Sequence, residues 1–265
     1  MKKKLTILCL LCMAASGLAK AQGTDNDLET VFGGRFSVTA DKKIVKGFHW
    51  TVDGEVRSSE NFSDLGRYQV GTGLTYKVTE NIKLGAGYLY ISDKNSADIW
   101  KPRHRVFGDV TFSLRSGDWR FALKERLQLT HREVGNKFQK VPNLLALKSR
   151  FKVSYKGSPV LTPYASIELR NVFNDPSCVA TWNPSSQTYS DYSFGGFNDI
   201  NINRLRGSLG LEWKVSNSHA FDFFLLEDYC RDKIIDTNAE GTKLKSLTYD
   251  RTFCSGIGIG YIFSF

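Results

Sequence analysis

The chain has 265 residues, of which 41% are hydrophobic and 13% aromatic, and its formal net charge is +9. Beyond residue 21, no apolar run approaches the roughly 20 residues that a membrane-spanning helix requires, so the composition excludes a helical membrane protein. The hydrophobic residues are instead dispersed, as alternating β-strands require.

The first 21 residues have the pattern of a cleaved secretory signal peptide. Three lysines, Lys2 to Lys4, precede an apolar run from Leu5 to Met13, and Ala19-Lys20-Ala21 supplies small residues for cleavage. Cleavage after Ala21 removes four lysines and lowers the net charge from +9 to +5. This moderate charge argues against a nucleic-acid-binding protein. We therefore expect a signal peptide over residues 1–21 and one domain over residues 22–265.

From Thr30 onward, apolar and polar residues alternate with a period of two, which predicts β-strands with one apolar face. The segment from Phe48 to Arg57 is a clear case, with Trp50 and Val52 on one face and Thr51 and Asp53 on the other. Eleven such segments begin near residues 32, 48, 68, 82, 103, 119, 145, 164, 204, 221 and 247. Because single-chain bacterial barrels normally have an even number of strands, we expect about 12, with about 10 as the fallback.

The connections between these segments alternate in length. Short turns are predicted at 79–81, 116–118, 156–160 and 216–218, and long loops at 93–102, 134–142, 171–201 and 232–245. This alternation is typical of a transmembrane barrel, whose strands must close because open edges cannot face lipid. We therefore predict an all-β protein, a single antiparallel up-and-down transmembrane β-barrel in the bacterial outer membrane. A soluble secreted barrel is disfavoured because its continuous apolar faces would aggregate in water.

The last predicted strand, Leu247 to Phe265, keeps its alternation to the final residue. Two acidic residues, Glu125 and Glu227, fall on the nominal lipid face. Because a charge there costs a few kcal/mol, we expect a β-bulge at each that turns the side chain inward.

Several segments resemble a family of Gram-negative outer-membrane barrels that is catalogued only as a domain of unknown function. The similarity is carried by residues 119–129, 147–155, 164–169 and 203–213 and by the terminal phenylalanine. The resemblance implies the barrel fold and the outer-membrane location. It also implies that Tyr261, Phe263 and Phe265 form the signal that the barrel-assembly machinery recognises. It brings no known activity.

Charged residues on the inward faces are the most distinctive polar feature. A basic belt is predicted on the lumen side and consists of Arg103, Arg105, Arg120, Lys124, Arg126, Lys148, Arg150, Lys152, Arg170, Arg204 and Arg206. An acidic counter-wall is predicted from Asp53, Glu55, Glu168, Glu212, Asp222, Asp228 and Asp250. One interpretation is an electropositive lumen that favours small anions. The other, which we expect to dominate in so narrow a barrel, is that these charges pair and fill the interior.

No catalytic or metal-binding motif is found. The four histidines, His49, His104, His131 and His219, stand apart, and the sequence has no G-x-S-x-G or H-E-x-x-H pattern. We therefore expect no enzymatic activity, no cofactor and no metal site. An odd number of cysteines follows the signal peptide, and the pairing of Cys178, Cys230 and Cys254 is left open.

These observations favour a narrow channel or a structural barrel with a basic lumen face. The expected partners are outer-membrane lipids, the barrel-assembly machinery during biogenesis and, for an open lumen, small anions. The alternative is a lipid-modifying outer-membrane hydrolase whose Ser/His site is assembled across strands, since such sites are defined by geometry rather than by sequence order.

Overall fold

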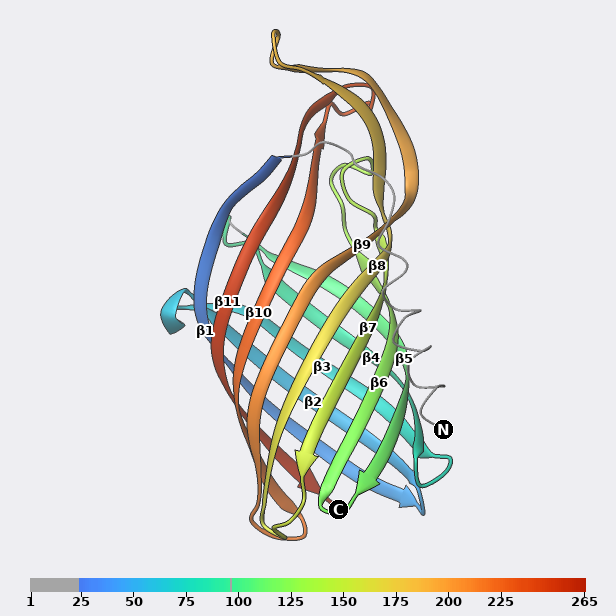
Figure 1. The fold of residues 1–265 in the computed structure, drawn as a ribbon, viewed down its shortest axis with the longest axis vertical. Coiled ribbons are helices and arrows are strands. Elements are labelled where there is room, and N and C mark those ends of the chain that lie inside the picture. The colour runs from blue at the N-terminus through green and yellow to red at the C-terminus, as the bar shows by residue number, and fades with distance from the viewer. Residues whose placement is uncertain (1–23, 96) are drawn as a thin grey trace.

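The alternating segments form a closed β-barrel in the computed structural model, which describes residues 24–95 and 97–265 (Figure 1). The signal peptide predicted over residues 1–21 lies outside the described residues. The strands are β1 (Thr24–Val45), β2 (Phe48–Ser59), β3 (Asp64–Lys77), β4 (Ile82–Lys94), β5 (Trp100–Ser116), β6 (Trp119–Arg132), β7 (Asn143–Tyr155), β8 (Leu161–Asn183), β9 (Thr188–Lys214), β10 (His219–Thr237) and β11 (Leu244–Ser264). A single 3₁₀ turn, η1 (Glu60–Phe62), joins β2 to β3. Within the described part, no helix is both long and apolar enough to span a membrane.

Neighbouring strands pair antiparallel around the barrel, except that β1 pairs with β11 in parallel. The predicted antiparallel up-and-down barrel is therefore confirmed, but the described residues form eleven strands rather than about 12 or about 10. An odd number makes the first and last strands run in the same direction, so the closing pair has to be parallel. Applying the even-number rule led to the wrong strand count, because each of the eleven alternating segments corresponds to a strand.

The loop predicted at 171–201 is largely wrong. In its place β8 and β9 continue as a paired hairpin that rises above the barrel, and only residues 184–187 connect them (Figure 1). The register shifts several times between Arg170 and Thr181, which marks β-bulges along the hairpin. The segment is rich in Asn, Ser, Asp and Gly, which favours turns, but cross-strand pairing satisfies most of its backbone polar groups. The loop predicted at 232–245 likewise shrinks to 238–243.

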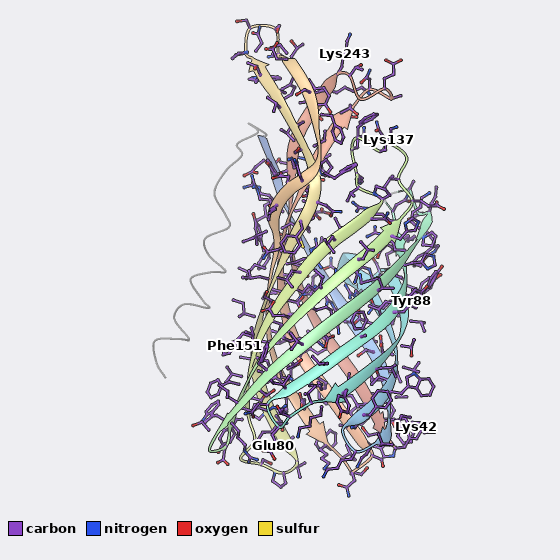
Figure 2. All side chains as sticks on the ribbon, turned by 90° about the vertical axis from the view of Figure 1, so that its right-hand side faces the viewer. Lys42, Glu80, Tyr88, Lys137, Phe151 and Lys243 are labelled. Atoms are coloured by element: carbon purple, nitrogen blue, oxygen red, sulfur yellow. The ribbon has the colours of Figure 1, made fainter. Side chains whose placement is uncertain are left out.

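The outward face of the barrel is apolar, as the alternation predicts. Leu114 and Leu209 are each 61% exposed and Leu225 is 58% exposed. Tyr88 and Phe151 are seen on the outside of the wall (Figure 2). Aromatic pairs flank this band, with Trp119–Tyr155 near the short turns and Tyr68–Trp100 near the long loops. Exposed apolar side chains between two aromatic belts are the surface of a lipid-facing barrel.

The bulges predicted at Glu125 and Glu227 are wrong. Pairing is continuous through both residues, so each carboxyl remains on the outward face. Each accepts a hydrogen bond from the serine directly opposite, Ser149 for Glu125 at 2.6 Å and Ser255 for Glu227 at 2.7 Å. A local hydrogen bond therefore takes the place of the expected backbone rearrangement.

Above the barrel, the strand extensions build a small core of their own. It consists of Cys178 from the β8–β9 hairpin with Ile235, Leu244 and Leu247 from β10 and β11. The loop 133–142 packs on this region, where Phe138 meets Phe194 with ring centroids 5.3 Å apart. The long-loop end of the barrel is thus an ordered structure rather than a set of separate loops.

Candidate functional site

The basic belt projects into the lumen from β5 to β9, on the face opposite the exposed apolar side chains. Four of its members, Arg126, Lys148, Arg170 and Arg204, are direct cross-strand partners on four successive strands. We call these the cationic row. Like charges placed directly opposite one another destabilise a sheet, so this row requires compensation from neighbouring carboxylates.

A second row of inward residues, two positions nearer the short turns, supplies that compensation. Here Arg150, Glu168, Arg206 and Asp228 are successive cross-strand partners from β7 to β10. We call this the mixed row. Because carboxylates and cations alternate in part of it, each acid can reach cations of both rows.

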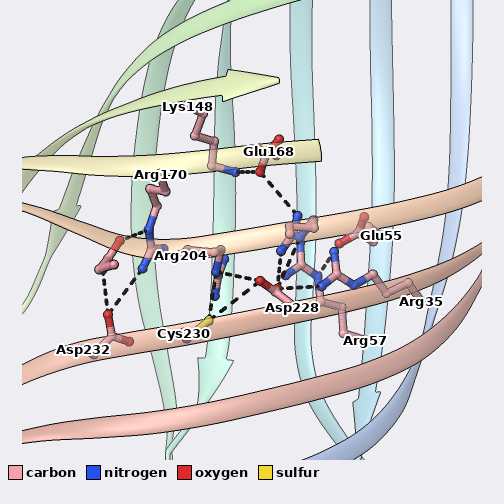
Figure 3. A network of polar contacts seen from close by, with 12 residues as sticks. Arg35, Glu55, Arg57, Lys148, Glu168, Arg170, Arg204, Asp228, Cys230 and Asp232 are labelled. Carbon is pink, nitrogen blue, oxygen red and sulfur yellow. Dashed lines mark hydrogen bonds and ion pairs between the residues drawn. The ribbon is translucent and has the colours of Figure 1, made fainter. Parts of the chain in front are cut away.

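Asp228 is the centre of the resulting network (Figure 3). Its Oδ2 lies 2.6 Å from Arg206 Nη2 and 3.5 Å from Arg35 Nη2, and its Oδ1 lies 3.3 Å from Arg204 Nε. The side chain of Asp228 is only 3% exposed. One carboxylate therefore holds three guanidinium groups from β1 and β9, across the parallel seam.

Two further carboxylates hold the rest of the rows together. Glu168 Oε1 lies 3.4 Å from Lys148 Nζ and 3.6 Å from Arg206 Nη1. Asp109 Oδ2 lies 3.0 Å from Lys124 Nζ and 2.7 Å from Arg126 Nη2. Most of the mid-lumen charge is thus paired, in agreement with the expectation for a narrow barrel.

The short-turn end has its own set of contacts. Glu212 lies 2.6 Å from Lys152 Nζ and 3.5 Å from Lys156 Nζ. Tyr164 donates a hydrogen bond of 3.0 Å to Asp222. Arg120 donates to the hydroxyl of Ser113 at 3.3 Å, so its guanidinium is held by a neutral acceptor. A cavity of about 270 Å³ lies here, with Lys77, Lys83, Arg120, Lys152 and Lys156 in its lining.

The long-loop end is the more basic of the two. Arg103 Nη1 lies 2.9 Å from Asp93, which also binds Arg67. Arg105, by contrast, donates to the hydroxyl of Thr130 at 2.9 Å. Arg170 donates to Asn203 at 2.7 Å and lies 3.4 Å from Asp232.

A cavity of about 410 Å³ lies above the cationic row, and we call it the outer vestibule. Its cationic lining residues are Arg57, Arg67, Arg103, Arg105, Arg132, Lys140, Lys148, Arg170, Arg204, Arg206 and Lys233. Only Asp175, Asp232 and Asp250 contribute carboxylates. Eight of these cations form ion pairs that bring in five carboxylates beyond the lining, Glu55, Asp93, Glu168, Asp199 and Asp228, so eleven cations face eight carboxylates and an excess of three positive charges remains.

The predicted acidic counter-wall is not brought together as one wall. Glu168 and Asp228 lie within the mixed row, and Glu55 pairs with Arg57 on its own strand. The others are dispersed: Glu212 and Asp222 lie near the short turns, Asp53 lies against Gly71, and Asp250 accepts a hydrogen bond from Asn26 near the long loops.

The prediction omitted several lumen residues that the structure brings into the site, namely Arg35, Arg57, Arg67, Asp93, Asp109 and Asp232. Their inward position follows from the same alternation, on β1 to β5 for the first five and on β10 for Asp232. The sequence does not show how the barrel closes, and closure brings Arg35 of β1 within 3.5 Å of Asp228 on β10, across β11.

The histidines and cysteines form separate contacts. His49 lies 3.0 Å from Asp41, and His104, His131 and His219 contact Tyr88, Asn143 and Tyr261 at 2.6, 2.8 and 2.7 Å. Among the described residues, Cys178, Cys230 and Cys254 are free thiols, and Arg204 Nε donates to Cys230 Sγ at 3.0 Å. In the described ranges, no group of three or more His, Cys, Asp or Glu residues could hold a metal ion. A Ser/His hydrolase site remains a prediction.

The proposed assembly signal lies at the short-turn end of β11. Phe263 stacks on His219 at 5.2 Å and on Phe265 at 5.1 Å between ring centroids, and Tyr261 lies on the same face. These aromatics are part of the lower aromatic belt, and their role in assembly remains a prediction.

Comparison with known proteins gives a family but no activity. Residues 32–238 match a family described as "Protein of unknown function (DUF2490)". No curated protein matches the sequence. Among solved structures, the outer-membrane protein OmpT of Vibrio cholerae is similar with a TM-score of 0.33 and 13% identity. That match covers 76% of this chain and 60% of the OmpT chain, so this chain spans less than two thirds of OmpT.

Proposed function

The chain belongs to the family of proteins of unknown function DUF2490, and on that premise we propose that it is an outer-membrane β-barrel whose lumen binds and conducts small anions. The membrane location is supported by the exposed apolar band and by the aromatic pairs at both of its ends. Such a surface is stable against lipid and would associate in water.

The observation that carries the proposal is the positive charge of the outer vestibule, whose eleven cations outnumber the eight carboxylates that line it or pair with its lining residues. A concave site lined by charges of one sign focuses the electric field and raises the local concentration of the opposite ion. Anions on the long-loop side therefore enter a favourable site before they meet the paired rows below.

Two features of the lumen bear on the conduction of an anion as well as on its binding. Arg105 and Arg120 are held by hydroxyl groups, so their charge is available to an anion at either end of the lumen. Between these ends the ion pairs of Glu168 and Asp228 narrow the path. We therefore expect a small conductance in which an anion exchanges between guanidinium groups while the same guanidinium groups repel cations.

The test is planar-bilayer recording of the refolded full chain under a KCl gradient. We expect a reversal potential shifted toward that of chloride, and we expect Arg105→Gln to reduce this shift. Arg231→Gln is the matched control, because Arg231 lies on the outward face in an ion pair of 2.9 Å with Asp25.

Openings that favour potassium, or an anion preference that Arg105→Gln and Arg231→Gln change equally, would reject the proposal. Anion binding in solution without any openings would reject the conducting version and leave a closed, anion-binding barrel.

A further inference from the structure

The wall of the barrel is incomplete at one seam. β1 pairs with β2 only from Arg35, opposite Arg57, toward the short turns. Residues 24–34 of β1 pair with β11 alone in the described structure. At the point of separation the backbone N–H of Gly34 donates to the Ser58 hydroxyl at 2.9 Å instead of to a β2 carbonyl. The upper part of β1 therefore presents a free edge.

Part of this free edge lies at the level of the lipid-facing band. Phe32 is paired with Ser255, whose hydroxyl contacts the outward Glu227. The outward face becomes polar only higher up, where Arg231 binds Asp25 at 2.9 Å. Unpaired backbone groups are costly against hydrocarbon, so an open edge at this depth has to be covered.

The cover is a single aromatic side chain. Phe62 of η1 packs edge-on against Phe32, with ring centroids 5.5 Å apart. A Cβ added to Gly34 would lie 2.3 Å from the Phe62 ring, so the ring sits directly on the glycine. Asn61 and Phe62 have φ values of 58° and 70°, which are rare for residues with large side chains. Backbone strain of this kind is found at switch regions and ligand clamps.

Behind the seam lies a cavity of about 410 Å³ with two chemically different walls. Gly33 and Leu226 contribute apolar surface beside the free edge. Arg57, Arg67 and Arg103 contribute guanidinium groups on the lumen side. In total, six cationic side chains and two carboxylates line this cavity.

We propose that this cavity binds the phosphate headgroup of an anionic phospholipid, whose acyl chains leave the barrel between β1 and β2 past Phe62. Guanidinium groups bind phosphate oxygens in pairs, which suits a cluster of arginines. A soluble anion would need neither an apolar wall nor a gap at the depth of the lipid. The inference rests on the proposed function only in that lumen cations bind anions.

The test is the lipid retained by the full chain in nanodiscs that contain equal amounts of phosphatidylglycerol and phosphatidylcholine with identical acyl chains. After extraction into detergent, native mass spectrometry counts the bound lipid of each class. We expect phosphatidylglycerol to exceed phosphatidylcholine about tenfold, and Arg67→Gln to remove most of that preference, as expected for loss of a charged hydrogen bond. Arg231→Gln should keep the preference. Equal retention of both lipids, or equal loss in both variants, would overturn the proposal.

A second arm tests the route. Phe62→Ala should speed exchange of the bound lipid, whereas Phe112→Ala, which removes an exposed phenylalanine far from the seam, should not. The seam can also be closed covalently with Gly34→Cys and Ser58→Cys in the Phe62→Ala chain, because the new Cβ at position 34 lies 3.1 Å from the position 58 side chain. Cys178, Cys230 and Cys254 are changed to serine in this variant. Oxidation should stop lipid exchange and reduction should restore it. An exchange rate that is the same with and without the cross-link would reject the route.

A third arm separates a lipid from a free anion. The wild-type chain is tested for binding of inorganic phosphate as well as for retention of phosphatidylglycerol. If it binds phosphate but retains no phosphatidylglycerol, the cavity is a site for soluble anions and the lipid proposal is overturned. A wild-type chain that shows chloride selectivity but no preference for phosphatidylglycerol rejects this inference alone. A wild-type chain that prefers phosphatidylglycerol but shows no chloride selectivity rejects the proposed conduction alone.

Discussion

Ser255 on β11 donates a hydrogen bond of 2.7 Å to Glu227 on β10, on the face of the barrel that contacts lipid. The pair Ser149 and Glu125 repeats this arrangement on β6 and β7 at 2.6 Å. In both cases the serine is the direct cross-strand partner of the glutamate. A polar side chain in hydrocarbon has no water to bond with, so its stability depends on this one neighbour.

Ser255→Ala should therefore destabilise the barrel more than the replacement of an exposed serine usually does. Because it leaves a carboxyl without its donor in lipid, we expect a loss of about 1–2 kcal/mol in the free energy of unfolding. Glu227→Leu should be neutral or stabilising, because it removes both the polar group and its need for a partner. Denaturant unfolding in phospholipid vesicles measures both. The double variant is the control: Ser255→Ala should cost little once Glu227 is leucine, and an equal cost in both backgrounds would contradict the coupling.

Asp228→Asn should be among the most damaging single changes in the lumen. Its carboxylate holds Arg35, Arg204 and Arg206, so its neutralisation leaves three guanidinium groups without their shared partner. Breaking a buried pair from one side costs about 3–5 kcal/mol. Equilibrium unfolding should show a loss of this order for Asp228→Asn.

Asp222→Asn is the matched control for that measurement. Asp222 accepts hydrogen bonds from the Tyr164 hydroxyl, at 3.0 and 3.2 Å, so its replacement should cost much less. Adding Arg35→Gln to Asp228→Asn should recover part of the loss, because it removes one uncompensated charge. Equal destabilisation by the two aspartate changes would show that Asp228 is not the centre of the network.

The sequence was sufficient to predict which side of the wall each lumen residue occupies. Alternation decides this residue by residue, and Arg126 and Lys148 lie inward as expected. The partners of these charges depend on register, which alternation does not specify. The contact between Arg35 and Asp228 depends further on barrel closure, since it joins the first strand to the tenth.

Strand ends were harder to predict than strand faces. Residues 171–201 have the composition of a loop, yet they pair as a hairpin because most residues of this part of β8 find a partner on β9 despite several register shifts. The free edge of β1 had no sequence signal either. It results from β2 ending at Ser59 while β1 begins at Thr24, a difference in length that becomes visible only when the two strands are aligned.

Gly241→Ala should loosen the loop 133–142. Gly241 has a φ of +69°, and a Cβ at this position would lie 2.4 Å from the Phe138 ring. The substitution thus combines backbone strain with a clash that displaces Phe138 from Phe194. Hydrogen exchange should become faster at residues 136–140, where Gln139 otherwise bonds Asp236 at 2.8 Å, and should not change in the barrel strands. In a Phe138→Ala background the clash disappears, so a further large effect of Gly241→Ala there would contradict this explanation.

Cys178 should react slowly with iodoacetamide in the folded protein. The residue lies in the hairpin above the barrel, and burial among Ile235, Leu244 and Leu247 raises the pKa of its thiol. A raised pKa lowers the thiolate fraction at a given pH, and the thiolate is the species that is alkylated. Folded Cys178 should therefore need a more alkaline pH than the unfolded chain to reach the same rate, as measured by mass spectrometry of its peptide. Leu247→Ala opens the small core and should increase the rate at pH 8 toward that of the unfolded chain, whereas Leu114→Ala on the lipid-facing wall should leave it unchanged. If folded Cys178 reacted as fast as the unfolded chain, the core formed by the two hairpins would not be closed in solution.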